Sequence, residues 1–201
     1  LSCPAGRFGN ESGLEAEREC HECPAGSFCS TGAQQPELCS AGTAQNATAQ
    51  GSCAKCSAGT FQPDAGQTGC SLCTAGSYCE EGSSSPLPCA AGSFSGAAGL
   101  ISADECAPCP LGSACNTGAT KPAACNPGTY AAERGMPTCS LCTPGKYQPE
   151  VGQSGCEACP IGHACTSVSS YRCPLGHWCA EGEQHACAAG LLGNASGLNS
   201  S

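Results

Sequence analysis

Large apolar residues occur along this chain singly or in pairs, separated by runs of glycine, serine, alanine and cysteine. No stretch repeats them every three or four residues, so the pattern predicts no α-helix. Instead, a phrase of cysteine, any two residues and glycine recurs, and eight times an aromatic residue follows that glycine by two positions. These aromatics are Phe8, Phe28, Phe61, Tyr78, Phe94, Tyr130, Tyr147 and Trp178. Short glycine- and serine-rich loops of this kind favour turns and two-residue strand pairs.

Each phrase predicts a turn followed by a small packed site. Proline second and glycine fourth, as in 3–6, 23–26, 109–112, 159–162 and 173–176, suit a type I turn. The aromatic would then lie across the adjacent disulfide and form a miniature core. A ladder of stacked aromatics that binds a ligand is the alternative. Such a ladder would be interrupted where other residues hold the position, at Ala44, Ala114, Ala164 and Leu192.

The 23 cysteines alternate strictly between those that open a phrase and those that close one. The openers are Cys3, Cys23, Cys39, Cys56, Cys73, Cys89, Cys109, Cys125, Cys142, Cys159, Cys173 and Cys187. The closers are Cys20, Cys29, Cys53, Cys70, Cys79, Cys106, Cys115, Cys139, Cys156, Cys165 and Cys179. Strict alternation indicates a tandem array of cross-linked loops. We call the segment that begins at each opener a module.

The spacing predicts that each opener is bonded to the next closer. The predicted bonds are 3–20, 23–29, 39–53, 56–70, 73–79, 89–106, 109–115, 125–139, 142–156, 159–165 and 173–179, with Cys187 bonded to a cysteine beyond residue 201. An interleaved scheme, with 23 bonded to 39 and 29 to 53, is the alternative.

Composition shows why the chain needs these bonds. Leu, Ile, Val and Phe supply only 20 of the 201 residues, about half the share below which a chain is normally disordered. A bridge that closes a loop of roughly 15 residues removes on the order of 3 kcal/mol of unfolded-state entropy. The sequence therefore predicts small disulfide-rich repeats in an elongated tandem array, with few short β-strands and no single large core.

A longer period is superimposed on the modules. Adding 86 to each of the first ten cysteines gives the position of another cysteine. The best-matched stretches are 61–70 and 147–156. We expect a first cysteine-rich super-repeat at 1–88, a second at 89–172, and the start of a further module at 173–201.

The cysteines and the charge also indicate a compartment. So many disulfides persist only in an oxidising space, so we expect a secreted protein or the extracellular part of a surface protein. Four sequons agree with this and are candidate N-glycosylation sites: Asn10, Asn46, Asn194 and Asn199. The net charge of −9, with only scattered basic residues, argues against nucleic acid as a partner. No apolar run could span a membrane, and no signal peptide is visible, so we expect a segment of a longer protein that supplies the signal.

The module resembles a known family. The phrase of cysteine, two residues, glycine and an aromatic, running on to a Cys-x-x-Cys pair, is similar to the ephrin-receptor-like cysteine-rich repeat, a relative of EGF-like and tumour-necrosis-factor-receptor modules. The stretch 56–76 is the best match. The resemblance implies a receptor ectodomain or a large surface protein of a protist or alga, including the mastigoneme-type hairs of cilia. The chain lacks the tandem Cys-Cys step of receptor modules.

Competing chemistry finds little support in the sequence. Cys53, Cys56, Cys70 and Cys73 have the spacing of a zinc ribbon, but the same pairs recur at every long-module junction. Redox activity would need a helix that lowers a thiol pKa. Calcium-binding consensus residues are missing. His163, His177 and His185 could converge, but solvated loop positions explain them better. We therefore predict no enzyme activity, no cofactor and no metal.

Two functions remain. The first is a structural segment of a large secreted or surface glycoprotein that assembles into an extracellular or ciliary filament, with copies of itself or another fibrous glycoprotein as partner. The alternative is a receptor or adhesin ectodomain that binds a protein ligand through its loops. Such a receptor should display one localised apolar or charged patch, and only 100–101 and 191–192 offer apolar pairs.

Overall fold

The computed structural model describes residues 2–11, 15–188 and 196, and its regular structure consists almost entirely of short antiparallel hairpins. Each hairpin is a separate two-stranded sheet, which confirms the strand pairs expected from the sequence. The paired strands are β1 (Arg7–Phe8) with β2 (His21–Glu22), β3 (Ser27–Phe28) with β4 (Glu37–Leu38), β5 (Thr43–Ala44) with β6 (Ala54–Lys55), β7 (Thr60–Phe61) with β8 (Ser71–Leu72), β9 (Ser77–Tyr78) with β10 (Leu87–Pro88), β11 (Ser93–Phe94) with β12 (Ala107–Pro108), β13 (Ser113–Ala114) with β14 (Ala123–Ala124), β15 (Thr129–Tyr130) with β16 (Ser140–Leu141), β17 (Lys146–Tyr147) with β18 (Glu157–Ala158), β19 (His163–Cys165) with β20 (Ser170–Arg172), and β21 (His177–Ala180) with β22 (Glu183–Ala186). Two 3-10 turns complete the regular structure, η1 (Glu17–Glu19) and η2 (Ala103–Glu105).

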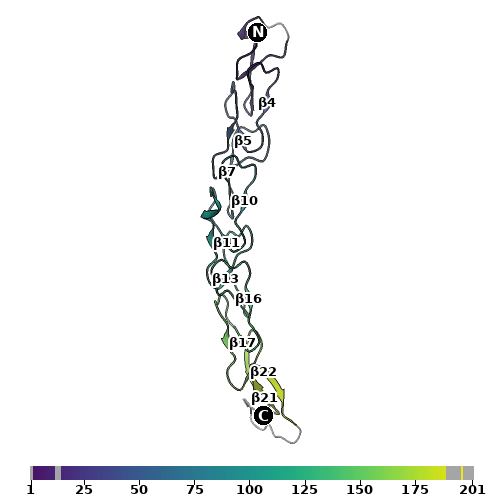
Figure 1. The fold of residues 1–201 in the computed structure, drawn as a ribbon, viewed down its shortest axis with the longest axis vertical. Coiled ribbons are helices and arrows are strands. Elements are labelled where there is room, and N and C mark those ends of the chain that lie inside the picture. The colour runs from purple at the N-terminus through teal and green to yellow at the C-terminus, as the bar shows by residue number, and fades with distance from the viewer. Residues whose placement is uncertain (1, 12–14, 189–195, 197–201) are drawn as a thin grey trace. The chain divides into compact units, whose positions relative to one another are not determined.

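The chain forms two compact units. The first comprises residues 1–89 and 95–106, and the second comprises residues 90–94 and 107–201. Strand β11 therefore belongs to the second unit, while the loop that follows it belongs to the first. Within each unit the hairpins follow one another in chain order (Figure 1).

The 86-residue period is visible in the secondary structure. Strand β1 begins at Arg7 and β11 begins at Ser93, and the same offset relates η1 to η2 and β9 to the start of β19. The two 17-residue loops, between Cys3 and Cys20 and between Cys89 and Cys106, are those that contain a 3-10 turn. Loop length thus selects the local structure in both copies.

The turn in each module begins one residue later than the sequence suggested. The N–H of Arg7 donates to the carbonyl of Pro4, and the equivalent bond, 3.0–3.2 Å long, recurs in all eleven modules through the one opened by Cys173. Glycine is therefore third in the turn, with φ of +72° to +89° across these modules. Positive φ at the third position defines a type II turn, so the type I prediction was wrong. Glycine is required here because other residues rarely adopt this φ.

Eleven disulfides join each opener to the next closer. This is the ladder order, and Cys29 is bonded to Cys23, whereas the interleaved scheme requires a bond to Cys53. Cys187 is free within this chain, but its N–H donates to the carbonyl of Gly176 as the other openers do to the preceding turn glycine. A bond from Cys187 to a cysteine beyond residue 201 stays a prediction.

The buried interior consists mainly of these half-cystines. Cys23, Cys29, Cys39, Cys73 and Cys79 are all 0% exposed. All eight aromatics at the repeated position are half-buried. The sequence assigned the miniature core to the aromatics, but the bridge itself is the best-shielded group. An aromatic side chain is too large for one short hairpin to enclose.

Candidate functional site

A set of backbone hydrogen bonds connects successive modules and recurs along the chain. In eight modules the N–H of the turn glycine donates, over 2.7–3.0 Å, to the carbonyl that follows the aromatic position of the next module. The bonds run from Gly6 to Cys29, Gly26 to Gln45, Gly42 to Gln62, Gly59 to Cys79, Gly76 to Ser95, Gly92 to Cys115, Gly112 to Ala131 and Gly128 to Gln148. Each turn thus holds the strand of the module that follows it.

A second set of bonds runs in the opposite direction. A residue with positive φ in the loop of one module donates its N–H to the carbonyl of the preceding opener at 2.8 Å. The donors are Gly32, Ala49, Gly66, Gly82, Gly99, Gly135 and Gly152, and the acceptors are Cys3, Cys23, Cys39, Cys56, Cys73, Cys109 and Cys125. Paired bonds in both directions make neighbouring modules interlock.

Close backbone contacts also join modules that are separated by one other module. A Cβ added to Gly42 would overlap the carbonyl oxygen of Gly82, which belongs to the module after next. Gly26 and the carbonyl of Gly66 are related in the same way, and so are Gly112 and the carbonyl of Gly152. The turn glycine is therefore required both for its φ and for the approach of another backbone.

Buried glutamines secure two of the four 14-residue loops from inside. Gln62 is 7% exposed; its Nε2 donates to the carbonyl of Gly69 at 2.6 Å, and its Oε1 accepts from the N–H of Asp64 at 3.0 Å. Gln148 makes the same two bonds in the second super-repeat. The sequence analysis missed this role, although the recurrence of glutamine after the aromatic at an offset of 86 could have revealed it.

Replacing Gln62 by alanine should weaken its loop measurably. The change leaves the N–H of Asp64 and the carbonyl of Gly69 without these partners, at a cost of about 1–3 kcal/mol. Hydrogen exchange at the amide of Asp64 should accelerate accordingly. Gln67→Ala, at an exposed position of the same loop, is the control. Equal exchange in both variants would show that the buried amide does not secure the loop.

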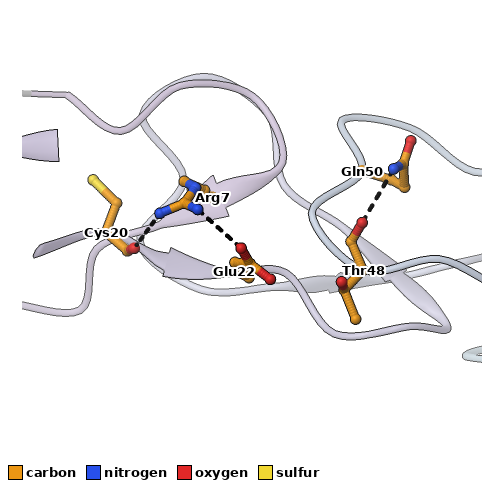
Figure 2. A network of polar contacts seen from close by, with 5 residues as sticks. All are labelled: Arg7, Cys20, Glu22, Thr48 and Gln50. Atoms are coloured by element: carbon orange, nitrogen blue, oxygen red, sulfur yellow. Dashed lines mark hydrogen bonds and ion pairs between the residues drawn. The ribbon is translucent and has the colours of Figure 1, made fainter. Parts of the chain in front are cut away.

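Two of the four candidate glycosylation sites lie on exposed loops. Asn10 and Asn46 are both exposed, whereas Asn194 and Asn199 lie outside the described residues. The sequon loop at Asn46 is ordered by local bonds: Gln45 Oε1 accepts from the N–H of Ala47, and Gln50 Nε2 donates to the carbonyl of Thr48 (Figure 2). The side chain of Asn46 is thus presented from a fixed backbone.

Charged side chains form few contacts. Arg7 spans the β1–β2 hairpin: its guanidinium donates to the carbonyl of Cys20 at 3.2 Å and to the carboxylate of Glu22 at 2.9 Å (Figure 2). The ammonium of Lys55 lies 3.9 Å from the carboxylate of Glu81 in the module after next. Both pairs are largely exposed, so each contributes at most about 1 kcal/mol.

The structure places the cysteines and histidines that the sequence offered as possible metal ligands. The four cysteines of the zinc-ribbon spacing are all half-cystines, because Cys53 is bonded to Cys39 and Cys73 to Cys79. His163 and His177 place Nδ1 3.2 Å from the carbonyls of Ile161 and Leu175, and His185 stacks on Trp178 with ring centroids 4.5 Å apart. Among the described residues no three His, Cys, Asp or Glu side chains gather as a metal site would require. In that same part of the chain, no helix is long and apolar enough to cross a bilayer.

The residue before each turn glycine is apolar in every module, although it is not buried. We call this the turn-tip position. It is occupied by Ala5, Ala25, Ala41, Ala58, Ala75, Ala91, Leu111, Pro127, Pro144, Ile161, Leu175 and, outside the described residues, Ala189. Leu111, Ile161 and Leu175 are 51%, 82% and 65% exposed. Burial does not explain this apolar preference.

Comparison with known proteins identifies one segment. Residues 128–173 match the family described as tyrosine-protein kinase ephrin type A/B receptor-like. No curated protein matches the chain. The stretch 56–76 lies outside the match, but its counterpart 86 residues later, 142–162, lies inside it. The array therefore contains ephrin-receptor-like cysteine-rich repeats, and these together with the disulfides indicate an extracellular, ectodomain-type module.

Proposed function

We propose that the chain is a non-catalytic structural segment of a large secreted or surface glycoprotein, and that it assembles into an extracellular or ciliary filament. Its partners would be copies of itself or another fibrous glycoprotein, and N-linked glycans would cover part of its loops. The turn-tip position is the main support. Exposed apolar residues at most of the described turns offer many equivalent weak contacts, and side-by-side association of long chains uses contacts of that kind.

The interlocking of modules supports the same function. Each module is hydrogen-bonded to its immediate neighbours, so modules can be added without redesign of a common core. The duplication into super-repeats 1–88 and 89–172 would be one such addition, with a further module starting at 173.

A receptor or adhesin ectodomain is the second candidate, and the match of residues 128–173 to a receptor-derived family favours it. The large exposed apolar residues are not confined to the pair 100–101. Leu38, Leu72, Leu141 and Ile161 are each more than 60% exposed and lie in separate modules. Leu191 and Leu192, which form the other apolar pair, lie outside the described residues.

Removal of the large turn-tip side chains tests the proposal. The secreted chain should self-associate in sedimentation equilibrium, and the variant Leu111→Ser, Ile161→Ser, Leu175→Ser should associate at least about tenfold more weakly, because three apolar contacts are lost. The control is Leu87→Ser, Leu141→Ser, Val151→Ser, which removes exposed aliphatics away from the turn tips. A wild-type chain that stays monomeric, or a control that weakens association equally, would contradict assembly through the turn tips.

A further inference from the structure

A groove of about 350 Å³ begins beside the sequon residue Asn46 and continues onto the next module. Ala44 and Asn46 line it from the module opened by Cys39. Ser57, Thr60 and Thr68 line it from the module opened by Cys56. The groove therefore lies across a junction between two modules of the first compact unit.

The second super-repeat shows why the groove is open here. Ala44 occupies the position that is aromatic in eight modules, and its counterpart 86 residues later is Tyr130. Ala44 is paired with Ala54 across its hairpin, whereas Tyr130 is paired with Ser140. Thr60 likewise corresponds to the longer Lys146. Small residues thus leave space beside Asn46, and the counterpart of Asn46 is Ala132, which cannot be glycosylated.

The lining suits a pyranose ring, which has an apolar face and a polar edge. The exposed methyl group of Ala54 supplies apolar surface, whereas Ala44 is only 8% exposed. Threonine and serine hydroxyls supply donors and acceptors: Thr60 Oγ1 donates to the carbonyl of Ser57 at 2.7 Å and keeps its lone pairs as acceptors. Lys55 also lines the groove. The exposed side chain of Asn46 lies at the groove, so a sugar bonded to its Nδ2 is within reach.

We propose that the first N-acetylglucosamine of a glycan on Asn46 lies in this groove and bridges the two modules. The inference rests on the proposed secretory route. There the sugar leaves a lipid diphosphate donor, its C1 bonds to Nδ2, and the amide nitrogen gives up a proton. The seated sugar shields the loop segments 57–60 and 68–70 and opposes separation of the modules.

Stepwise trimming of the glycan tests the seating in the full chain secreted from a host that adds N-glycans. An endoglycosidase that leaves one N-acetylglucosamine should preserve slow hydrogen exchange at 57–60 and 68–70. An amidase that removes the whole glycan should accelerate it about tenfold, since a shielding contact is lost. Because the amidase converts Asn46 to aspartate, Thr48→Ala, which abolishes the sequon and keeps Asn46, must exchange equally fast.

Two variants serve as matched controls. Ala44→Tyr with Ala54→Ser reproduces the Tyr130–Ser140 pair, fills the groove, and should abolish the protection while Asn46 stays glycosylated. Ala132→Asn with Arg134→Thr places a sequon at the equivalent exposed position of the second super-repeat, where Tyr130 is present, and trimming there should not change exchange at 143–146 and 154–156.

Mass spectrometry of the intact peptide distinguishes a failure of glycosylation at Asn46 from a failure of the sugar to lie in the groove. An occupied Asn46 whose removal leaves exchange unchanged, or equal protection at both sequon positions, overturns the seating alone. An unoccupied Asn46 in secreted material contradicts both the glycosylation and the seating.

Discussion

The Gly42→Ala variant should unfold with a free energy about 2–5 kcal/mol lower than that of the parent chain. Two costs combine. Gly42 has φ of +83°, which disfavours any residue with a Cβ, and its Cβ would overlap the carbonyl oxygen of Gly82. Relief of that overlap requires movement of the turn, which also carries the bonds from the N–H of Gly42 to Gln62 and from the N–H of Cys56 to Gly42.

Gly69→Ala is the matched control for Gly42→Ala. Gly69 lies in the next module, its φ is outside the left-handed region, and an added Cβ would meet no atom within 4 Å. Its substitution should change the free energy of unfolding by less than about 1 kcal/mol. Chemical denaturation of both variants provides the measurement. Equal destabilisation would mean that flexibility of the unfolded chain, and not the contact between modules, explains the requirement for glycine.

Removal of the short bridge Cys73–Cys79 should destabilise the chain more than removal of the long bridge Cys56–Cys70. Loop entropy alone predicts the opposite order, with about 2.4 kcal/mol for the 6-residue separation and about 3 kcal/mol for the 14-residue separation. However, both half-cystines of the short bridge are 0% exposed, whereas Cys70 is only half-buried. The additional buried cavity costs on the order of 1–2 kcal/mol, which exceeds the entropic difference.

The measurement compares two double variants, Cys73→Ala with Cys79→Ala and Cys56→Ala with Cys70→Ala, by thermal and chemical unfolding. Each pair is removed together so that the change adds no free thiol that could exchange with another bridge. A larger loss of stability on removal of the long bridge would show that loop closure, and not the buried cystine interior, dominates the energetics.

The sequence by itself determined the modular organisation. The alternation of opener and closer cysteines and the invariant glycine are local patterns that fix structure within one short loop, and the 86-residue offset relates loops of the same kind in the two halves of the chain. Hairpins of two residues follow from them, because a bridge next to a turn leaves little chain to pair. The sequence also predicts an oxidising compartment, since the number of bridges does not depend on how the modules pack.

Only the tertiary structure decided which groups meet between modules. The turn at 3–6 was assigned one residue early because the bond that defines it, from Arg7 to Pro4, depends on the φ of Gly6 and on the carbonyl of Cys29 in the next module. The interior was assigned to aromatics because their size suggested burial. Burial depends on the neighbours, and adjacent backbones surround the cystines more completely than they surround Phe28 or Tyr78. The contact of Gly42 with Gly82 and the groove beside Asn46 have the same origin, because each joins residues of different modules that no local pattern relates.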